Sequence, residues 1–269
     1  MTGEGRRVTV ASPAAWWLSD APLFDGLPPA ELRLDADELL EDLFDLLEIT
    51  DGVLDHELLR AVGVATTVEE LLSRPAGAED LLARLSDSSR TPSSRATLGI
   101  YRAISLLPEE RWPEPPKRVR VFDGSTSRIT DADDAVVVVA PHHAPLIATA
   151  GIPGTRRLAD ILDLRTSDEV VEDFDPPDGN VRDVPQVVHT LLPNAPLTYV
   201  EHDDLEFEGQ SLSWWVSADA VVHAATLDGL ARGLAWSSAA WTRRWELSAV
   251  LDNAESVNEA LVERAFDES

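Results

Sequence analysis

The adjacent histidines His142 and His143 are the residues best suited to chemistry in this sequence of 269 residues. They follow the apolar run AVVVVA, which is typical of a buried β-strand, and residues in loops after strands often carry function. Imidazoles bind metal ions and exchange protons near neutral pH, so the pair could form a metal site or an acid–base group. Pro141 and Pro145 flank the pair and favour a rigid loop instead. We keep His142 and His143 as a candidate site and favour the rigid loop.

A second group of metal-ligand types, His202, Asp203 and Asp204, lies in an expected hairpin turn, where aspartates are common for structural reasons. The sequence contains no HExxH, no GxSxG serine elbow, and neither a GxGxxG nor a GxxxxGK[ST] phosphate loop. It has no cysteine, which excludes thiolate metal sites and cysteine nucleophiles. The sequence therefore predicts no catalytic residues, no metal and no cofactor, and we expect no enzyme.

Tryptophans are the strongest candidates for partner contacts. Trp214 and Trp215 are neighbours in an expected strand, so their rings should point to opposite faces, one into the core and one toward a partner. Trp16 and Trp17 belong to a lead-in segment that we expect to pack, with Phe24, on the following domain, and they are further candidates for partner contacts. Three later tryptophans are expected in the core: Trp236, Trp241 and Trp245.

Charge excludes several classes of partner. The chain has 22 Lys and Arg against 49 Asp and Glu, a net charge of −27, which repels phosphate and anionic lipid. It also lacks a secretion signal and the ~20 consecutive apolar residues of a membrane span. We expect a cytoplasmic protein that binds neither nucleic acid directly nor membranes. The acidity fits solubility, attraction of a basic partner, or mimicry of nucleic acid.

The first region, residues 1–112, is predicted to be mainly helical. The run LDADELLEDLFDLLEI, which begins at Leu34, has leucines at helical spacing, and Asp35 or Asp37 is its expected N-cap. Thr67 and Glu70 have the spacing of a capping box. Further helices are expected over residues 55–62, 67–74, 77–86 and 95–107.

The proline-rich stretch RWPEPPKRV predicts a domain boundary near residue 112, followed by an α+β region over residues 113–269. The four short strands expected within residues 197–224 should form an antiparallel meander, and Thr226 should begin a long helix. The predicted fold class is α+β, with a helical N-terminal region, the meander and a long C-terminal helix pair. The remaining elements are expected as strands at 118–123 and 135–140 and as helices at 154–164, 184–193, 227–252 and 254–266.

The C-terminal run TYVEHDDLEFEGQSLSWWVSADAVVHAATLDGLARGLAWSSAAWTRRWELSAVL resembles the C-terminal part of actinobacterial sacsin-like proteins. AAWWLSDAPLFDG and LDHELLRAVGVATTVEELL resemble the same family. Members carry an N-terminal ATP-binding domain related to the GHKL ATPase of the ninety-kilodalton heat-shock chaperone. The asparagine helix and the DxGxG loop of that domain are missing from this sequence, so the resemblance covers only the region downstream and implies no ATP-binding residue here.

Together these observations predict a non-catalytic protein-interaction or scaffold module, the C-terminal part of a sacsin-like, chaperone-related protein. The partner is expected to be a protein of unknown identity, and homo-oligomerisation stays open. Two alternatives remain. One is an acidic inhibitor that mimics nucleic acid and blocks a basic partner, and the other is an unrecognised enzyme centred on His142 and His143.

Overall fold

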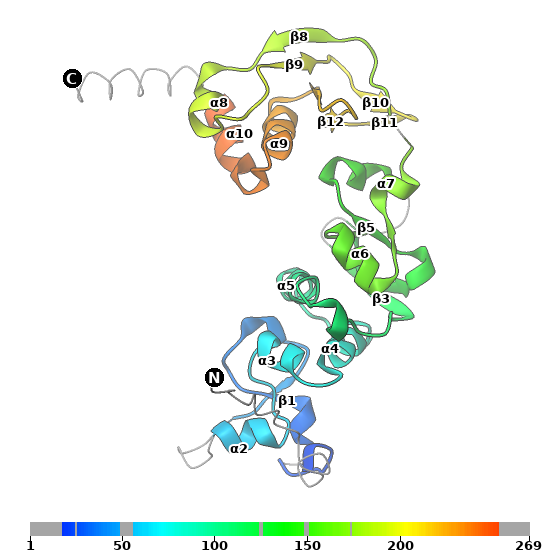
Figure 1. Ribbon diagram of the computed structural model, residues 1–269, viewed down its shortest axis with the longest axis vertical. Helices are drawn as coiled ribbons and strands as arrows, with labels where there is room; N and C mark the ends of the chain where they lie inside the picture. The colour runs from blue at the N-terminus through cyan, green and yellow to red at the C-terminus, as the bar shows by residue number, and fades with distance from the viewer. Residues whose placement is uncertain are drawn as a thin grey trace, which may run out of the picture. The chain divides into compact units, whose positions relative to one another are not determined.

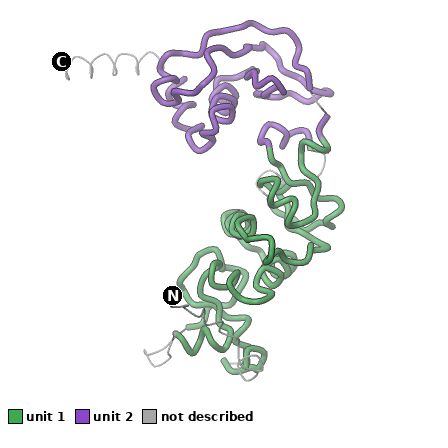
Figure 2. Tube along the Cα trace, in the orientation of Figure 1, with its two compact units in different colours: residues 1–139, 147–170 green, residues 140–146, 171–269 purple. Residues whose placement is uncertain are grey.

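The computed structural model describes residues 18–24, 26–48, 56–123, 126–147, 151–172 and 174–252 (Figure 1). These residues mix helices with several sheets, so the predicted α+β class is confirmed. The chain divides into two compact units, shown in Figure 2: unit 1 (residues 1–139 and 147–170) and unit 2 (residues 140–146 and 171–269). Trp16, Trp17 and the helix expected over 254–266 lie outside the described residues. None of the described helices is both long and apolar enough to span a membrane.

Unit 1 combines short helices with a mixed five-stranded sheet of order β4-β3-β6-β5-β7. In this sheet β3 is antiparallel to β4 and β6, whereas β5 is parallel to β6 and β7. The elements are η1 (Pro29–Glu31), β1 (Leu32–Arg33), η2 (Glu38–Leu40), β2 (Asp45–Leu46), α2 (His56–Ala61), α3 (Val68–Ser73), α4 (Gly77–Leu85), α5 (Ser94–Ile104), η3 (Glu109–Arg111), β3 (Arg118–Asp123), β4 (Thr126–Asp131), η4 (Ala132–Asp134), β5 (Val136–Val138), β6 (Gly151–Pro153), α6 (Arg156–Leu162), β7 (Arg165–Thr166) and α7 (Ser167–Val170).

The helix predicted from Leu34 onward is wrong. Only the 3-10 turn η2 forms there, between the parallel strands β1 and β2. Asp37 does act as a cap, because its carboxylate accepts from the Leu39 N–H at 2.9 Å, but its second oxygen accepts from the Val68 N–H at 3.0 Å. Asp42 then has a left-handed φ of 62°, which an α-helix cannot continue through. Leu40 and Leu43 of this run are buried by a different backbone, whereas Leu46 is 46% exposed.

The other predicted N-terminal helices are confirmed as α2, α3, α4 and α5. Thr67 caps α3, since its hydroxyl accepts from the Glu70 N–H at 3.2 Å. Phe24 packs, as expected, on a small cluster that includes Leu32 and Leu59.

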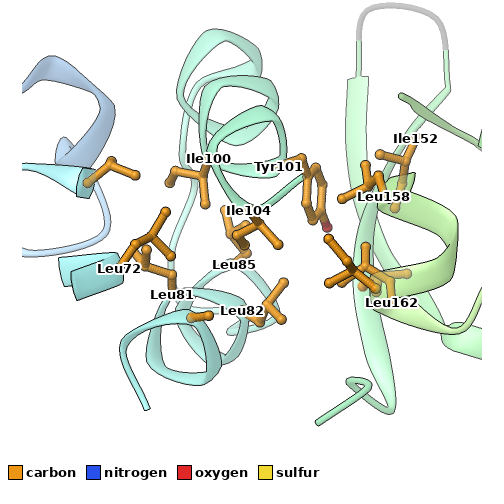
Figure 3. Packing of buried hydrophobic residues seen from close by; sticks show 14 of the residues in the cluster. Leu72, Leu81, Leu82, Leu85, Ile100, Tyr101, Ile104, Ile152, Leu158 and Leu162 are labelled. Carbon is orange, nitrogen blue, oxygen red and sulfur yellow. The ribbon is translucent and has the colours of Figure 1, made fainter. Parts of the chain in front are cut away.

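The predicted boundary near residue 112 is wrong, because one hydrophobic core joins α3, α4 and α5 to the sheet and α6. Figure 3 shows Ile100 and Tyr101 on opposite sides of α5, with Tyr101 directed toward Leu158 of α6. The Tyr101 hydroxyl donates to the Arg120 carbonyl at 2.9 Å and accepts from the Arg120 N–H at 3.1 Å. The proline-rich stretch is therefore a connection inside unit 1.

Replacing Tyr101 with Phe should destabilise unit 1 by about 1–3 kcal/mol, because both buried backbone groups of Arg120 lose their partner. Hydrogen exchange of α5 and β3 peptides in urea measures the change. Tyr199→Phe in unit 2 is the matched control, since that hydroxyl has no hydrogen-bond partner among the described residues. Equal protection of α5 in wild type and Tyr101→Phe would contradict the argument.

Unit 2 contains a four-stranded sheet of order β12-β13-β9-β8 and a separate β10-β11 hairpin. Strands β12 and β13 are antiparallel, as are β8 and β9, but β9 and β13 pair in parallel, so the expected meander is present only in part. The elements are η5 (Pro141–Leu146), β8 (Asn180–Asp183), α8 (Gln186–Leu191), β9 (Thr198–Glu201), β10 (Glu206–Phe207), β11 (Gln210–Ser211), β12 (Trp214–Val216), β13 (Val222–Ala224), α9 (Leu227–Ser237), η6 (Trp241–Arg243) and α10 (Arg244–Asp252).

The single helix expected over residues 227–252 is two helices, α9 and α10, packed against each other. Thr226 caps α9 as predicted, accepting from the Gly229 N–H at 2.9 Å. The chain reverses after α9, where Ala239 has a left-handed φ of 53° and the Ser237 hydroxyl donates to the Gly233 carbonyl at 2.9 Å. This break separates the tryptophans of the two helices.

Candidate functional site

The candidates His142, His143, Trp214 and Trp215 come together in unit 2. The ring of Trp215 lies 4.6 Å from that of His142 and 5.3 Å from that of His143, measured between centroids. His142 also contacts Trp214 edge-on at 5.2 Å and Trp236 at 6.3 Å. The loop after β5 thus packs against β12, although about seventy residues separate the two segments in sequence.

The expectation of one exposed ring on β12 is wrong, because only 6% of Trp214 and 4% of Trp215 is exposed. Both faces of the strand are covered. Trp214 stacks on Trp241 at 5.8 Å, and α9 packs against the same strand. Trp215 packs with Phe174 and with a buried cluster that includes Leu205. These two tryptophans therefore build the core of unit 2 and offer no free contact surface.

His142 is held in its neutral form. Burial lowers its pKa to about 3, and the charge of the neighbouring His143 lowers it further in the same direction. Its Nδ1 is buried without a hydrogen-bond partner in the described structure. Among the described residues, no cluster of three or more His, Asp or Glu could hold a metal ion. The ring contacts of His142 in the described structure are packing contacts with Trp214, Trp215 and Trp236.

A second histidine pair, His202 and His223, is formed in unit 2 and is not predicted by the sequence patterns. His202 Nε2 lies 2.9 Å from His223 Nδ1, both residues are more than 90% buried, and burial lowers the pKa of each. The pair forms because β9 and β13 are adjacent and parallel, an arrangement that a meander does not predict. A cavity of about 300 Å³ lies beside His202, between Tyr199 and the start of α9 at Thr226.

Among the described residues, the most exposed aromatic side chain lies elsewhere, on α10. Trp245 is 58% exposed, so its expected place in the core is wrong. Its ring centroid lies 4.9 Å from the guanidinium carbon of Arg244 and 5.6 Å from that of Arg232 on α9. Arg244 also lies over Trp241, at 4.7 Å. We call Arg232, Trp241, Arg244 and Trp245 the Trp245 patch.

The sequence does carry a signal for the patch. The run WTRRWE places two arginines between two tryptophans, in a chain where acids outnumber bases by more than two to one. Cation–π contacts between these residue types are each worth about 0.5–1 kcal/mol at exposed sites. The prediction that Trp241 and Trp245 are both buried assumed one continuous helix. The helix is broken at Ala239, so that assumption is wrong.

Comparison with models of protein families, with curated proteins and with solved structures finds no match to this chain. The resemblance to sacsin-like proteins thus stays a prediction.

The stability of unit 2 should fall as the pH drops below about 6.5. Below this pH, His142 binds a proton in the unfolded chain but not in the folded one, where its ring is buried. The stability therefore keeps falling until the pH reaches about 3, the pKa of His142 in the folded chain. The loss is at most about 1.4 kcal/mol per pH unit for this residue, and the lowered pKa values of His202 and His223 act in the same direction.

Urea unfolding followed by tryptophan fluorescence at pH 7.5 and pH 5 measures this loss. His142→Phe keeps a ring in the cluster without the titrating group, so its stability should depend less on pH than that of the wild type. His189→Gln on α8 is the matched control and should keep the full dependence. Identical pH dependence in wild type and His142→Phe would refute the assignment.

Proposed function

We propose that this chain is a non-catalytic protein-interaction or scaffold module of the cytoplasm, and that it forms the C-terminal part of a sacsin-like, chaperone-related protein. The exposed Trp245 carries the proposal, because tryptophan and arginine dominate the residues that supply binding energy in protein interfaces. A ring of this size left in water forfeits the stabilisation that burial of its apolar surface would bring.

The Trp245 ring is also prepared for binding. Arg232 and Arg244 each lie within 6 Å of its centroid, so the side chain is restricted before a partner arrives. Binding then costs less side-chain entropy than it would for a free rotor. Contacts between arginine and an exposed tryptophan are expected on a surface that binds another protein.

The resemblance supports the same part of the chain. The segment that resembles sacsin-like proteins contains LDGLARGLAW, which forms most of α9, and WTRRWE, which contributes three of the four residues of the Trp245 patch. In this proposal the nucleotide site belongs to an upstream domain of the parent protein, and this module supplies a contact to a protein partner. If the coding sequence upstream encodes no GHKL domain, the proposed relation to sacsin-like proteins is wrong. The proposal that this chain is an interaction module does not depend on that relation.

Trp245→Ala should weaken partner binding by tenfold or more, because a central tryptophan at an interface contributes about 2 kcal/mol or more. Partners are identified by cross-linking and mass spectrometry in the native cell, then purified and titrated against the full chain by calorimetry. Leu106→Ala, at a position 76% exposed in unit 1, is the matched control and should bind like the wild type. A purified partner whose affinity is the same for Trp245→Ala and wild type would overturn the assigned surface.

A further inference from the structure

Arg244 differs from the other described arginines of unit 2, because it has no carboxylate partner among the described residues. Arg182 pairs with Glu201 at 2.9 Å, Arg232 with Asp228 at 2.8 Å, and Arg243 with Glu246 at 3.0 Å. In a chain with 49 acidic residues, an arginine without an ion-pair partner among the described residues calls for a physical reason.

The guanidinium of Arg244 is fixed in place by rings instead of by an acid. It lies 4.7 Å from the ring centroid of Trp241 and 4.9 Å from that of Trp245, and its Nη1 donates to the Trp241 carbonyl at 2.9 Å. A guanidinium has five N–H donors, and this is the one hydrogen bond that the described residues give it. The remaining donors form a planar fork of the shape that a carboxylate accepts.

We propose that the Trp245 patch binds a protein segment that presents an Asp or Glu carboxylate beside a large apolar side chain. The carboxylate accepts from the free N–H groups of Arg244, and the apolar side chain packs on the exposed ring of Trp245. This inference rests on the proposed function and names the chemistry of its partner.

Local charge permits such a ligand despite the net charge of the chain. Arg232 is paired with Asp228, Arg243 is paired with Glu246, and Arg244 has no carboxylate partner among the described residues, so these five residues together carry 3 − 2 = +1. Charges farther away than about 8 Å are largely screened at physiological salt.

The net charge of the whole chain disfavours larger occupants, whose surfaces would extend beyond the patch. Nucleic acid would bring many phosphates against a chain of −27, and a second copy would bring another −27. A single carboxylate on a separate protein avoids both penalties.

A peptide array tests the inference with the full chain at about 0.15 M salt. Each immobilised peptide of about twelve residues contains one Asp or Glu beside Leu, Phe or Trp, and its twin carries Asn or Gln instead. Wild type should retain acidic peptides about tenfold better than their amide twins, as expected for charge-assisted hydrogen bonds. Arg244→Gln should abolish that difference, and Arg244→Lys should restore it only in part, because lysine keeps the charge and loses the planar fork.

Arg95→Gln is the matched control, since it makes the same change of charge at an 81% exposed side chain of unit 1 and should behave like the wild type. Tryptophan fluorescence verifies that each variant is folded. No preference for acidic peptides, a preference that survives Arg244→Gln, or an Arg244-dependent dimer in sedimentation would each overturn the inference. If Trp245→Ala loses the cross-linked partner while Arg244→Gln keeps it, the interaction module stands and the carboxylate ligand falls.

Discussion

The close approach of α9 to strands β12 and β13 determines the rest of unit 2. A Cβ on Gly229 would lie 1.9 Å from the Ser213 carbonyl oxygen, and one on Gly233 would lie 2.5 Å from Val222 Cγ1. Only glycine allows the helix to lie so near the sheet. Because α9 covers one face of β12, the ring of Trp214 is enclosed, and the chain has to reverse at Ala239 to bring Trp241 onto it.

That reversal also explains why an exposed tryptophan is found on α10. In one continuous helix, Trp241 and Trp245 would be four residues apart on the same face and would be buried together. The turn through η6 instead places Trp241 against Trp214 and leaves Trp245 58% exposed, with Arg244 between the two rings. Packing of the core and exposure of the Trp245 patch are thus consequences of one backbone feature.

Local signals in the sequence were sufficient for most helices and strands but not for their assembly. Thr67 and Thr226 cap helices as their spacing predicts, since an N-cap depends on residues only three positions apart. The parallel pairing of β9 with β13, which brings His202 to His223, depends on contacts between distant segments and has no local pattern. The helix predicted from Leu34 onward does not form for a related reason. The Asp37 carboxylate accepts a hydrogen bond from the Val68 N–H, thirty-one residues away, and this contact competes with helix formation.

Arginine has two roles in this acidic chain, and their contrast bears on recognition. Arg84 and Arg120 are buried and donate to carbonyls of neighbouring segments, Arg84 to Ala30 and Arg120 to Leu85, so their donors are used up inside unit 1. Arg244 instead lies against two aromatic rings, and its one hydrogen bond to the described residues, from Nη1 to the Trp241 carbonyl, leaves its other donors unused. A donor that is fixed in position and still unsatisfied loses little entropy when an acceptor arrives, which is the property that a recognition site requires.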